Sequence, residues 1–437
     1  MKQTLTASAR KVWHQGLRKT FSFLPRDLRF AFFRSFVDCD PAPDPRLVLH
    51  IAQTREDLEA CFRLLHDAYV ASGFMKPAPS GLRATIYHAL PTTTTLCAKF
   101  EDRVVGTVSL IRESVFGFPL QAIFDLRQIR ERGGRIAEVS ALAIHPDFRK
   151  TGGAILFPLI KFMYDYCSTF FDTRHLVIAV HPTRIEMYES LLLFQRLEQK
   201  QVDNYDFANG APAVGASLDL LTAPQRFQDV YADKAQRKNL HHYFIRLKLP
   251  NTRLPQRRYF TTNDPVMTTA LLDYFFNQRT QVFAQLGMRE KRLLHAIYNL
   301  PEHKAMLPTL DAASAQGHSL RQHQRYSLKC PGNFTTMVEG RQEVAALRVI
   351  ELSHYGFLAQ AKTPIPTRQW GEATVRLGDR ERSTVRAMAV RSKRSGGHMF
   401  YGFTLAEPDL AWRKFVGALS AGATQGDLDN ATRFLAS

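Results

Sequence analysis

Apolar and polar positions between residues 47 and 220 alternate between two periods, one typical of strands and one typical of helices. Short β-prone runs predict strands over Leu47–Ile51, Thr95–Phe100, Val104–Arg112, Ile136–Ile144 and Leu176–Val180. Apolar residues at helical spacing predict helices over Arg55–Val70, Gly153–Phe171 and Thr183–Phe194. This order predicts an α+β unit built on a mixed sheet.

A second group of β-prone runs, separated by turn residues, lies near the C-terminus. The runs are Ala345–Leu352, Gly356–Ala361, Glu372–Leu377, Thr384–Arg391 and His398–Leu405. They predict a small barrel, which Leu410–Leu419 closes as a helix. Between the two units, Asp264–Leu300 reads as helix with a pause near Gly287. This region either extends the first unit or joins it to the second as a signalling helix.

With 437 residues the chain is too long for one ordinary core. We expect a basic amphipathic segment, a first α+β domain, a helical extension or linker, a barrel domain and a tail. Their expected bounds are 1–46, 47–225, 226–317, 318–422 and 423–437. A hinge is expected at 312–317.

The net charge of +18 implies an acidic partner, such as an anionic membrane surface or an acidic protein. No zinc-finger spacing and no RNP-type aromatic motif occurs, so nucleic acid is not expected as a partner. The five cysteines are scattered and form no CxxC, so neither a metal site nor a disulfide framework is expected. A reducing cytoplasm is the simplest compartment.

Residues 1–40 interleave basic and aromatic residues, without the cleavage site of a signal peptide. One reading is a basic amphipathic helix on anionic lipid, which would make the protein peripheral on the inner membrane. The other reading is a helix packed on the first domain with a solvated basic face.

One acid interrupts the apolar run Ile136–Ile144, and this is Glu138. Burial would raise its pKa, so it would serve as a general base or hold a substrate ammonium. A structural acid paired with Arg135 or another base is the alternative. The following turn, 145–153, is rich in basic residues and glycine and precedes a helix, so its amides predict an anion cradle.

The turn Arg149-Lys-Thr-Gly152-Gly153-Ala154 loosely matches the signature of GNAT acyltransferases. A closer resemblance is to the long-chain N-acyl amino acid synthases, which are related to acyl-homoserine lactone synthases. It rests on Ala137–Ala143, the His-Pro-x-x-Arg turn at 145–149, His181-Pro-x-Arg184 with Tyr188 and Phe194, and Asn209–Gly215. These stretches lie within residues 48 to 225.

This resemblance implies transfer of an acyl group from acyl carrier protein to an amine. Glu138, His181 and Tyr188 become catalytic candidates; His181 would carry protons or bind the acceptor carboxylate, with helix capping as its alternative. Tyr188 would assist the leaving thiolate or pack in the core. The expected donor-binding residues are Ser140, Leu142, Arg149, Thr151, Gly152 and Gly153, with backbone amides after Ser140 polarising the thioester. Arg184 would bind the acceptor, unless it is solvated or faces the carrier.

The C-terminal unit carries Arg321-Gln-His-Gln-Arg325 and then Glu351-Leu-Ser353-His-Tyr-Gly356. Paired guanidiniums suit a planar, multiply anionic ligand. The segment from about Ser319 to Leu419 resembles a PilZ domain, the bacterial receptor module for cyclic di-GMP. The family has Asp or Asn where this chain has Glu351, so a contact to a guanine edge would be displaced or lost. Arg321, Arg325, Glu351, Ser353 and Gly356 are the implied ligand residues.

The expectation is therefore a GNAT-like N-acyltransferase fused to a six-stranded PilZ barrel that regulates it through cyclic di-GMP. Two alternatives stay open. One is a non-enzymatic cyclic di-GMP effector with a degenerate GNAT-like module. The other is a GNAT acetyltransferase that uses acetyl-CoA.

Overall fold

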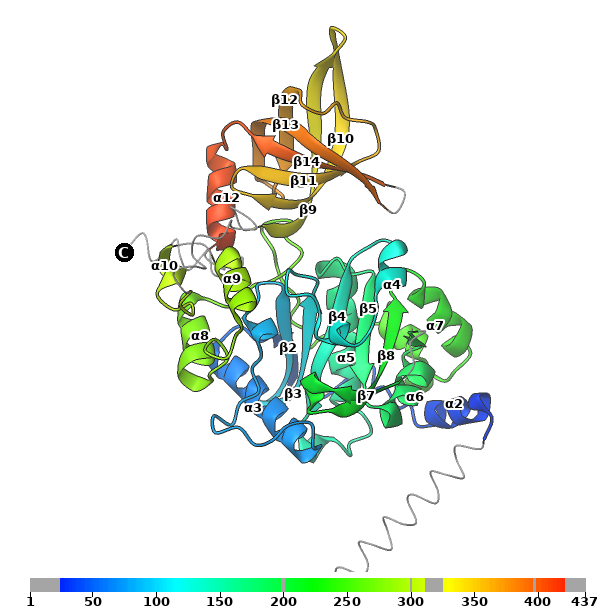
Figure 1. Cartoon of the computed structure of the whole chain (residues 1–437). Coiled ribbons are helices and arrows are strands. Elements are labelled where there is room, and N and C mark those ends of the chain that lie inside the picture. Colours follow the sequence, from blue (N-terminus) through cyan, green and yellow to red (C-terminus); the bar gives the residue numbers. More distant parts are fainter. Residues whose placement is uncertain (1–23, 198–200, 299–300, 311–324, 396–397, 421–437) are drawn as a thin grey trace, which may run out of the picture.

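The computed structural model describes residues 24–197, 201–298, 301–310, 325–395 and 398–420 (Figure 1). Two units are visible, a larger one built on a mixed sheet and a barrel beside it. The predicted fold class is therefore confirmed. The expected hinge at 312–317 and the tail at 423–437 lie outside the described residues.

The sheet of the larger unit has the order β1-β2-β3-β4-β5-β8-β6, and β7 pairs with β8. Its strands are β1 (Leu47–Ile51), β2 (Thr93–Phe100), β3 (Arg103–Arg112), β4 (Ile136–Ile144), β5 (His175–Val180), β6 (Gln195–Arg196), β7 (Val202–Tyr205) and β8 (Ala211–Asp219). The pairing of β4 with β5 is parallel, whereas the other described pairings in this sheet are antiparallel. The bounds predicted for β1 and β4 are confirmed.

Helices cover both faces of this sheet. They are α3 (Arg55–Ala71), α4 (Arg127–Glu131), α5 (Leu156–Asp165), α6 (Pro182–Leu191) and α7 (Ala223–Tyr231). Short helical turns are η1 (Ile86–Ala89), η2 (Pro119–Ala122), η3 (Pro146–Phe148), η4 (Tyr166–Phe170), η5 (Asp206–Ala208), η6 (Gln236–Lys238) and η7 (His242–Arg246). Thr54 caps α3 by accepting a hydrogen bond from the amide of Asp57. The long apolar helix α5 is buried against the sheet.

Strands β4 and β5 stay paired for only three positions, ending at Glu138 and Val177. Beyond this point β4 has a bulge opposite Thr107 and Ser109, and Ala141 takes a positive φ of 55°. Bulges bend a strand and redirect its side chains. The two strands therefore separate immediately after Glu138.

The region after Arg246 differs from the predicted helix. It contains α8 (Thr269–Asp273), η8 (Tyr274–Arg279), α9 (Met288–Ile297) and α10 (Pro301–Lys304). The first helix begins only after Thr268, whose side chain caps it by accepting a hydrogen bond from the amide of Leu271. Asp264 lies before this cap, with its carboxylate bound by Arg257 and by the hydroxyl of Tyr166. Phe275 packs edge-on against Phe62 of α3, so this region extends the core of the first unit.

The second unit is a closed barrel with the order β10-β11-β14-β13-β12-β9. Its strands are β9 (Tyr326–Val338), β10 (Arg341–Ser353), β11 (Gly356–Ala361), β12 (Trp370–Arg376), β13 (Arg382–Ser395) and β14 (His398–Leu405), followed by α12 (Leu410–Ser420). The six strands expected are confirmed, although the β-prone runs had marked only five of them. Helix α12 closes the barrel by burying Trp412 and Phe415 in its core.

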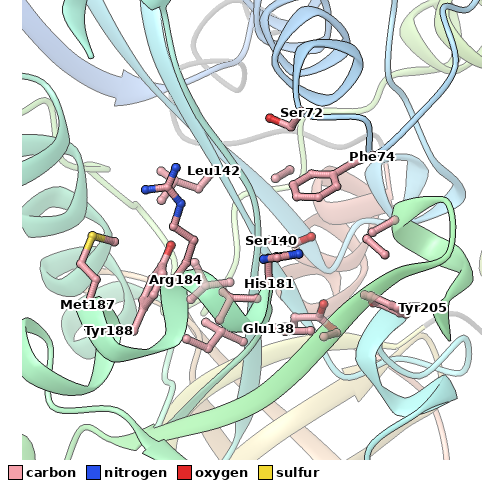
Figure 2. A pocket seen from close by; sticks show the side chains of 18 of the residues that line it. Ser72, Phe74, Glu138, Ser140, Leu142, His181, Arg184, Met187, Tyr188 and Tyr205 are labelled. Atoms are coloured by element: carbon pink, nitrogen blue, oxygen red, sulfur yellow. The ribbon is translucent and has the colours of Figure 1, made fainter. Parts of the chain in front are cut away.

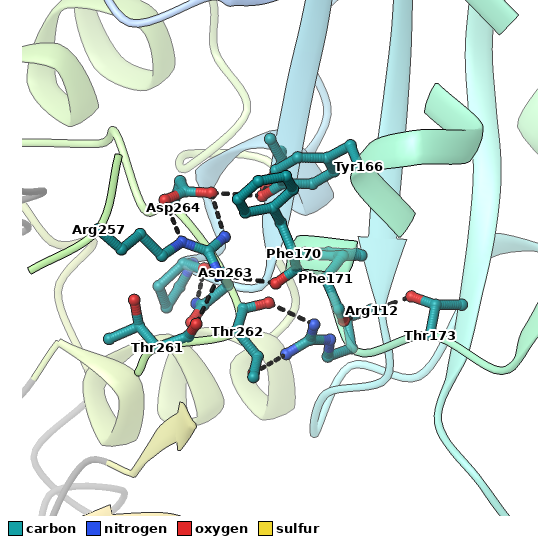
Figure 3. A network of polar contacts seen from close by, with 12 residues as sticks. Arg112, Tyr166, Phe170, Phe171, Thr173, Arg257, Thr261, Thr262, Asn263 and Asp264 are labelled. Carbon is teal, nitrogen blue, oxygen red and sulfur yellow. Dashed lines mark hydrogen bonds and ion pairs between the residues drawn. The ribbon is translucent and has the colours of Figure 1, made fainter. Parts of the chain in front are cut away.

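Residues 257–264 form a connecting segment that contacts both units (Figure 3). Toward the barrel, the amide of Phe260 donates to the carbonyl of Leu377, and the amide of Lys329 donates to the carbonyl of Phe260. Toward the sheet, the buried guanidinium of Arg112 donates to the hydroxyl and the carbonyl of Thr262. The connecting segment is therefore bonded to β3 on one side and to the barrel on the other.

The N-terminal helix α2 (Arg26–Ser35) lies against α6 through its basic residues. Arg26 pairs with Glu189 at 2.9 Å, and Arg29 pairs with Glu186 at 2.8 Å. Leu28 and Phe36 of the same region are largely exposed. The helix packs on the first domain as one reading expected, but its basic face is turned inward because α6 offers two carboxylates. Residues 1–23 lie outside the described residues.

Candidate functional site

A cavity of about 650 Å³ opens where β4 and β5 separate. Residues of β4, β5, α5 and α6 line it together with residues of α3 and of the chain around β7. Figure 2 shows Glu138 between His181 and Tyr205, with Arg184, Met187 and Tyr188 on the opposite side from Phe74. This size is that of a pocket for a small organic ligand.

Glu138 lies on the wall of this cavity and is only 2% exposed. Its Oε2 accepts a hydrogen bond of 3.0 Å from the amide of Leu120. Within the described part of the chain no cation pairs with it, and Arg135 instead binds Asp172. Burial raises the pKa of Glu138 to about 8, although the Leu120 amide opposes the rise. A carboxyl with this pKa can exchange a proton near neutral pH.

Tyrosine hydroxyls surround this carboxyl. Burial is the main cause that raises the pKa values of Tyr69, Tyr87 and Tyr205, and the charge of Glu138 raises them further. The pKa of Tyr87 becomes about 12. These phenols therefore remain hydrogen-bond donors at neutral pH. The sequence reasoning named none of the three, because they come from distant parts of the chain.

The cavity brings together six of the residues predicted from sequence for the acyltransferase. They are Glu138, Ser140, Leu142, His181, Arg184 and Tyr188. Ser140 and Leu142 lie on β4 beyond its last pairing with β5. The backbone after Ser140 carries the bulge and the positive φ of Ala141, which aim this stretch of β4 at the cavity.

His181 is the N-cap of α6 and also lines the cavity. Its Nδ1 lies 2.8 Å from the Thr183 hydroxyl and accepts a longer bond from the Thr183 amide. The ring stacks on Phe74 with 6.1 Å between centroids. His181 therefore caps α6 and lines the cavity at the same time.

Tyr188 and Arg184 both project from α6. Burial raises the pKa of Tyr188 to about 12, so its phenol stays protonated. The ring of Tyr188 also packs edge-on against Phe194. Arg184 is exposed at the cavity, and its guanidinium has no hydrogen bond or ion pair to the described residues.

The predicted anion turn lies outside this cavity, before the first residue of α5. Gly152 and Gly153 both have positive φ, and a side chain at Gly153 would collide with the ring of Phe157. No described residue accepts a hydrogen bond from their amides. Arg149 donates to the carbonyl of Ile144, and the Thr151 hydroxyl donates to the carbonyl of Phe148. The turn is therefore held by its own side chains, with two amides available to an anion.

A smaller apolar cavity adjoins the first and shares six lining residues with it. The shared residues are Leu142, Leu156, Ile160, Met187, Tyr188 and Leu192. Phe157 and Leu191 complete its lining. The smaller cavity holds only about 40 Å³, so a hydrocarbon chain would lie mainly in the larger cavity, along the almost wholly apolar wall between β4, α5 and α6.

The barrel has a separate cavity of about 240 Å³ lined by Arg325, Glu351, Ser353 and Gly356. Arg325 and Glu351 form an ion pair of 3.4 Å, and each side chain is about one third exposed. Arg321 lies outside the described residues. Glu351, Ser353 and Gly356 of the predicted motif thus lie in one cavity with Arg325, the second arginine of Arg321-Gln-His-Gln-Arg325.

Gly356 leaves no room for a side chain. A side chain there would meet the carbonyl of Phe403 on β14 at 2.5 Å. The same cavity also contains Arg391, which the sequence reasoning missed. Its side chain lies over Gly402, where a Cβ would be 2.7 Å from its Nε. No sequence motif marks Arg391, because a bulge in β13 places it there.

All five cysteines are buried free thiols. One of them, Cys97, lies with His50 and Asp57 in a group that contains three possible metal ligands. Both ring nitrogens of His50 lie near the Cys97 sulfur, Nε2 at 3.3 Å and Nδ1 at 3.7 Å. Lys99 already neutralises Asp57 at 3.2 Å. This arrangement is that of a packed polar cluster.

The mixed sheet, its separating strands and the cavity define a GNAT-like acyltransferase fold. Residues 60–219 match the family model for the N-acyl amino acid synthase FeeM, and this match supports an acyltransferase. The resemblance predicted for this part of the chain is thereby confirmed. No curated protein matches the sequence.

Several solved structures are similar in fold. FeeM, an N-acyl amino acid synthase from uncultured soil microbes, has 22% identity and a TM-score of 0.34, over 42% of this chain and 95% of its own. BjaI, a CoA-dependent acyl-homoserine lactone synthase solved with SAM and isopentyl-CoA, has 20% identity and a TM-score of 0.34. The match covers 48% of this chain and 95% of BjaI. A putative acetyltransferase, yncA from Salmonella typhimurium, has 16% identity and a TM-score of 0.29, and the match covers 40% of this chain and 94% of yncA.

Proposed function

We propose that the protein is an N-acyltransferase that moves a long-chain acyl group from a carrier thioester to the amine of an amino acid. The observation that carries this proposal is Glu138, a buried carboxyl with no cation partner among the described residues, at a cavity with an apolar extension. A buried acid that serves only structure is normally paired. The ammonium of the substrate would lie beside Glu138 in the cavity, where no cation of the described residues pairs with this carboxyl.

The reaction follows from this placement. The acceptor ammonium gives a proton to Glu138, and the neutral nitrogen attacks the thioester carbonyl. As the C–N bond forms, the C–S bond breaks. The second proton of the nitrogen ends on the leaving thiol, and the proton on Glu138 passes to solvent. Tyr188 keeps its own proton and donates a hydrogen bond to the departing thiolate.

The donor is proposed to be acyl carrier protein rather than acyl-CoA. The phosphopantetheine arm carries one phosphate, which matches the two available amides of Gly152 and Gly153. Lys150 and Arg149 are exposed beside them, so an acidic carrier would meet positive charge. Acetyl-CoA, the donor of the alternative acetyltransferase, would leave the apolar extension of the cavity unused.

The barrel is proposed to be a PilZ domain that binds cyclic di-GMP. Arg325 and Arg391 supply two guanidiniums in one cavity with Glu351 and Ser353. The ion pair between Arg325 and Glu351 must open for a phosphate to reach Arg325. Opening this pair costs little free energy, because both side chains are partly exposed and surface ion pairs contribute only about 0–1 kcal/mol.

Contacts between the units support regulation of transfer by this ligand. Ile350 is the bulged residue of β10, since the pairing on both sides skips from Val349 to Glu351. Its carbonyl accepts a hydrogen bond of 2.8 Å from Arg135, the residue immediately before β4. The hydrogen bond between Arg135 and Ile350 thus joins two sites: Ile350 is next to Glu351 of the barrel cavity, and Arg135 is three residues before Glu138.

The N-terminal segment is proposed to rest on an anionic membrane surface. The described helices include none that is both long and apolar enough to cross a bilayer. The exposed apolar side chains of Leu28 and Phe36 on a strongly basic protein suit the headgroup region instead. Cosedimentation with phosphatidylglycerol vesicles, but not with phosphatidylcholine vesicles, is expected.

The test of the main proposal supplies the purified protein with a mixture of amino acids and, in separate reactions, palmitoyl carrier protein, palmitoyl-CoA or acetyl-CoA. Mass spectrometry should detect an N-acyl amino acid with the carrier-bound donor, and the Glu138→Gln variant should form much less. Absence of any N-acyl product would favour the non-enzymatic effector. A product formed only from acetyl-CoA would favour the acetyltransferase.

A further inference from the structure

The hydroxyl of Tyr205 is a buried donor that lacks a partner. Tyr205 ends β7, lines the main cavity and is 5% exposed. No described residue forms a hydrogen bond with its hydroxyl. A buried polar group left without a partner costs about 1–3 kcal/mol, and such groups in a cavity wall are commonly satisfied by the ligand.

Arg83 is a second group with an unmet requirement. Its guanidinium lies between the rings of Tyr69 and Phe207, at 4.0 and 5.1 Å from their centroids. It donates to the carbonyl of Phe207 at 2.8 Å, but no described carboxylate pairs with it. Burial lowers the pKa of Arg83, whereas the charge of Tyr69 and a hydrogen bond with it raise the pKa. A buried cation is stabilised by an anion nearby.

The two groups lie on the same side of the cavity. Tyr69, Tyr205 and Phe207 all line the cavity wall, and Arg83 lies behind Tyr69 and Phe207. Glu138 faces the same space as a potential anion. Glu138 on the cavity wall and Arg83 behind that wall carry opposite charges, as do the carboxylate and the ammonium of an amino acid.

We propose that Tyr205 and Arg83 form the subsite for the carboxylate of the acceptor. Tyr205 donates a hydrogen bond to this carboxylate, and Arg83 attracts it through the thin aromatic wall. The amine of the same molecule is then directed to Glu138. This assignment rests on the proposed function, because it presumes that an amine is acylated in this cavity.

Tyr205 has one competing role, which is to polarise the thioester carbonyl of the donor. The two roles differ in what they affect. A carboxylate subsite changes KM for an acceptor that has a carboxylate and does not change the use of its methyl ester. A donor to the thioester changes kcat for both acceptors equally.

The test compares an amino acid with its methyl ester as acceptors for wild-type protein and for Tyr205→Phe and Arg83→Met. The wild type should prefer the acid by 50-fold or more, on the order expected for a charged hydrogen bond plus a nearby charge. Tyr205→Phe should raise KM for the acid about tenfold and leave the ester unchanged. Arg83→Met should remove most of the preference, and Arg83→Lys should restore part of it.

Tyr243→Phe is the matched control. Tyr243 is also buried with an unpartnered hydroxyl, but it packs on Phe157 and Phe244 away from the cavity lining. Its variant should keep the wild-type preference. A fall of kcat for acid and ester alike in Tyr205→Phe, or equal use of both acceptors by the wild type, would overturn the assignment.

Binding measured without turnover separates this inference from the proposed function. N-lauroyl glycine and its methyl ester are titrated into each protein by calorimetry. The acid should bind roughly tenfold or more tightly than the ester to the wild type and to Tyr243→Phe, and Arg83→Met should lose most of this preference. Tight acid binding without any N-acyl product would contradict the enzyme and keep the anion subsite, whereas equal binding of acid and ester would refute the subsite.

Discussion

The two cavities hold their carboxylates in opposite ways. Glu138 is buried and unpaired among the described residues, so its environment alone raises its pKa to about 8. Glu351 is one third exposed and already paired with Arg325. The first arrangement suits proton transfer, because the acid changes charge near neutral pH. The second suits recognition, because solvent screens the pair and a ligand can replace one member of it.

The largest expected effect is on stability, and it concerns Glu138. Its folded pKa lies above its ordinary value of 4.5, so the folded protein holds this proton more tightly than the unfolded chain. The stability it confers is complete below pH 4.5 and is lost as the pH rises through about 8. Glu138→Gln should therefore gain stability over wild type with rising pH, by roughly 4–5 kcal/mol between pH 4 and pH 9.

Denaturant unfolding of both proteins across this range measures that difference. Glu351→Gln is the comparison variant, and the gap between it and wild type should change by less than about 1 kcal/mol. A difference that is independent of pH for Glu138→Gln would show that its carboxyl titrates normally in the folded protein.

The second effect is on catalysis. Glu138→Gln keeps the acceptor for the Leu120 amide but cannot take a proton, so kcat should fall about 10²–10³-fold. Steady-state assays with a saturating acyl donor measure this fall. Glu189→Gln is a suitable control, since Glu189 is equally buried but pairs with Arg26 and Arg196 outside the cavity. Comparable activity of Glu138→Gln and wild type would remove the proposed base.

The third effect tests the barrel cavity. Arg325→Ala and Arg391→Ala should each weaken cyclic di-GMP binding about 10–100-fold, because each removes charged hydrogen bonds to phosphate. Isothermal titration calorimetry measures the affinity. Arg386→Ala removes an arginine stacked on Trp370, outside the cavity, and should bind normally. Normal binding by Arg391→Ala alone would restrict the site to the residues that the sequence had marked.

The smallest effect concerns the bond between the two regions. Arg135→Ala removes the hydrogen bond to Ile350, so cyclic di-GMP should alter the transfer rate about fivefold less than in wild type. Arg258→Ala breaks an ion pair with Glu381 that also joins the units, but it is remote from β4 in sequence. It should preserve the response. Equal wild-type rates with and without saturating cyclic di-GMP would remove the regulatory proposal itself.

The elements that sequence predicted well are those whose pattern is local. Strand β4 was predicted with its observed bounds, and the burial of Glu138 followed from its place in an apolar run. The helix expected from Asp264 begins later, because Thr268 is the residue that caps α8. Similarly, the basic face of α2 turned inward because α6 presents Glu186 to it.

The residues that sequence missed meet only in the folded chain. Tyr205 lies at the end of β7 and Arg83 lies in the loop after α3, and no spacing relates them to each other. Arg391 enters the barrel cavity through a bulge that its own sequence does not announce. A motif can mark a cluster on one segment, whereas a cavity assembled from several segments has no such signature.

The pH dependence of kcat/KM for the amino acid tests the role of Glu138 most directly. With saturating acyl donor, kcat/KM of the wild type should rise through an apparent pKa of about 8, and Glu138→Gln should lose both this rise and most of the rate. If the variant kept the wild-type rate and the same rise, the titrating group would be elsewhere, and Glu138 would not be the proton acceptor.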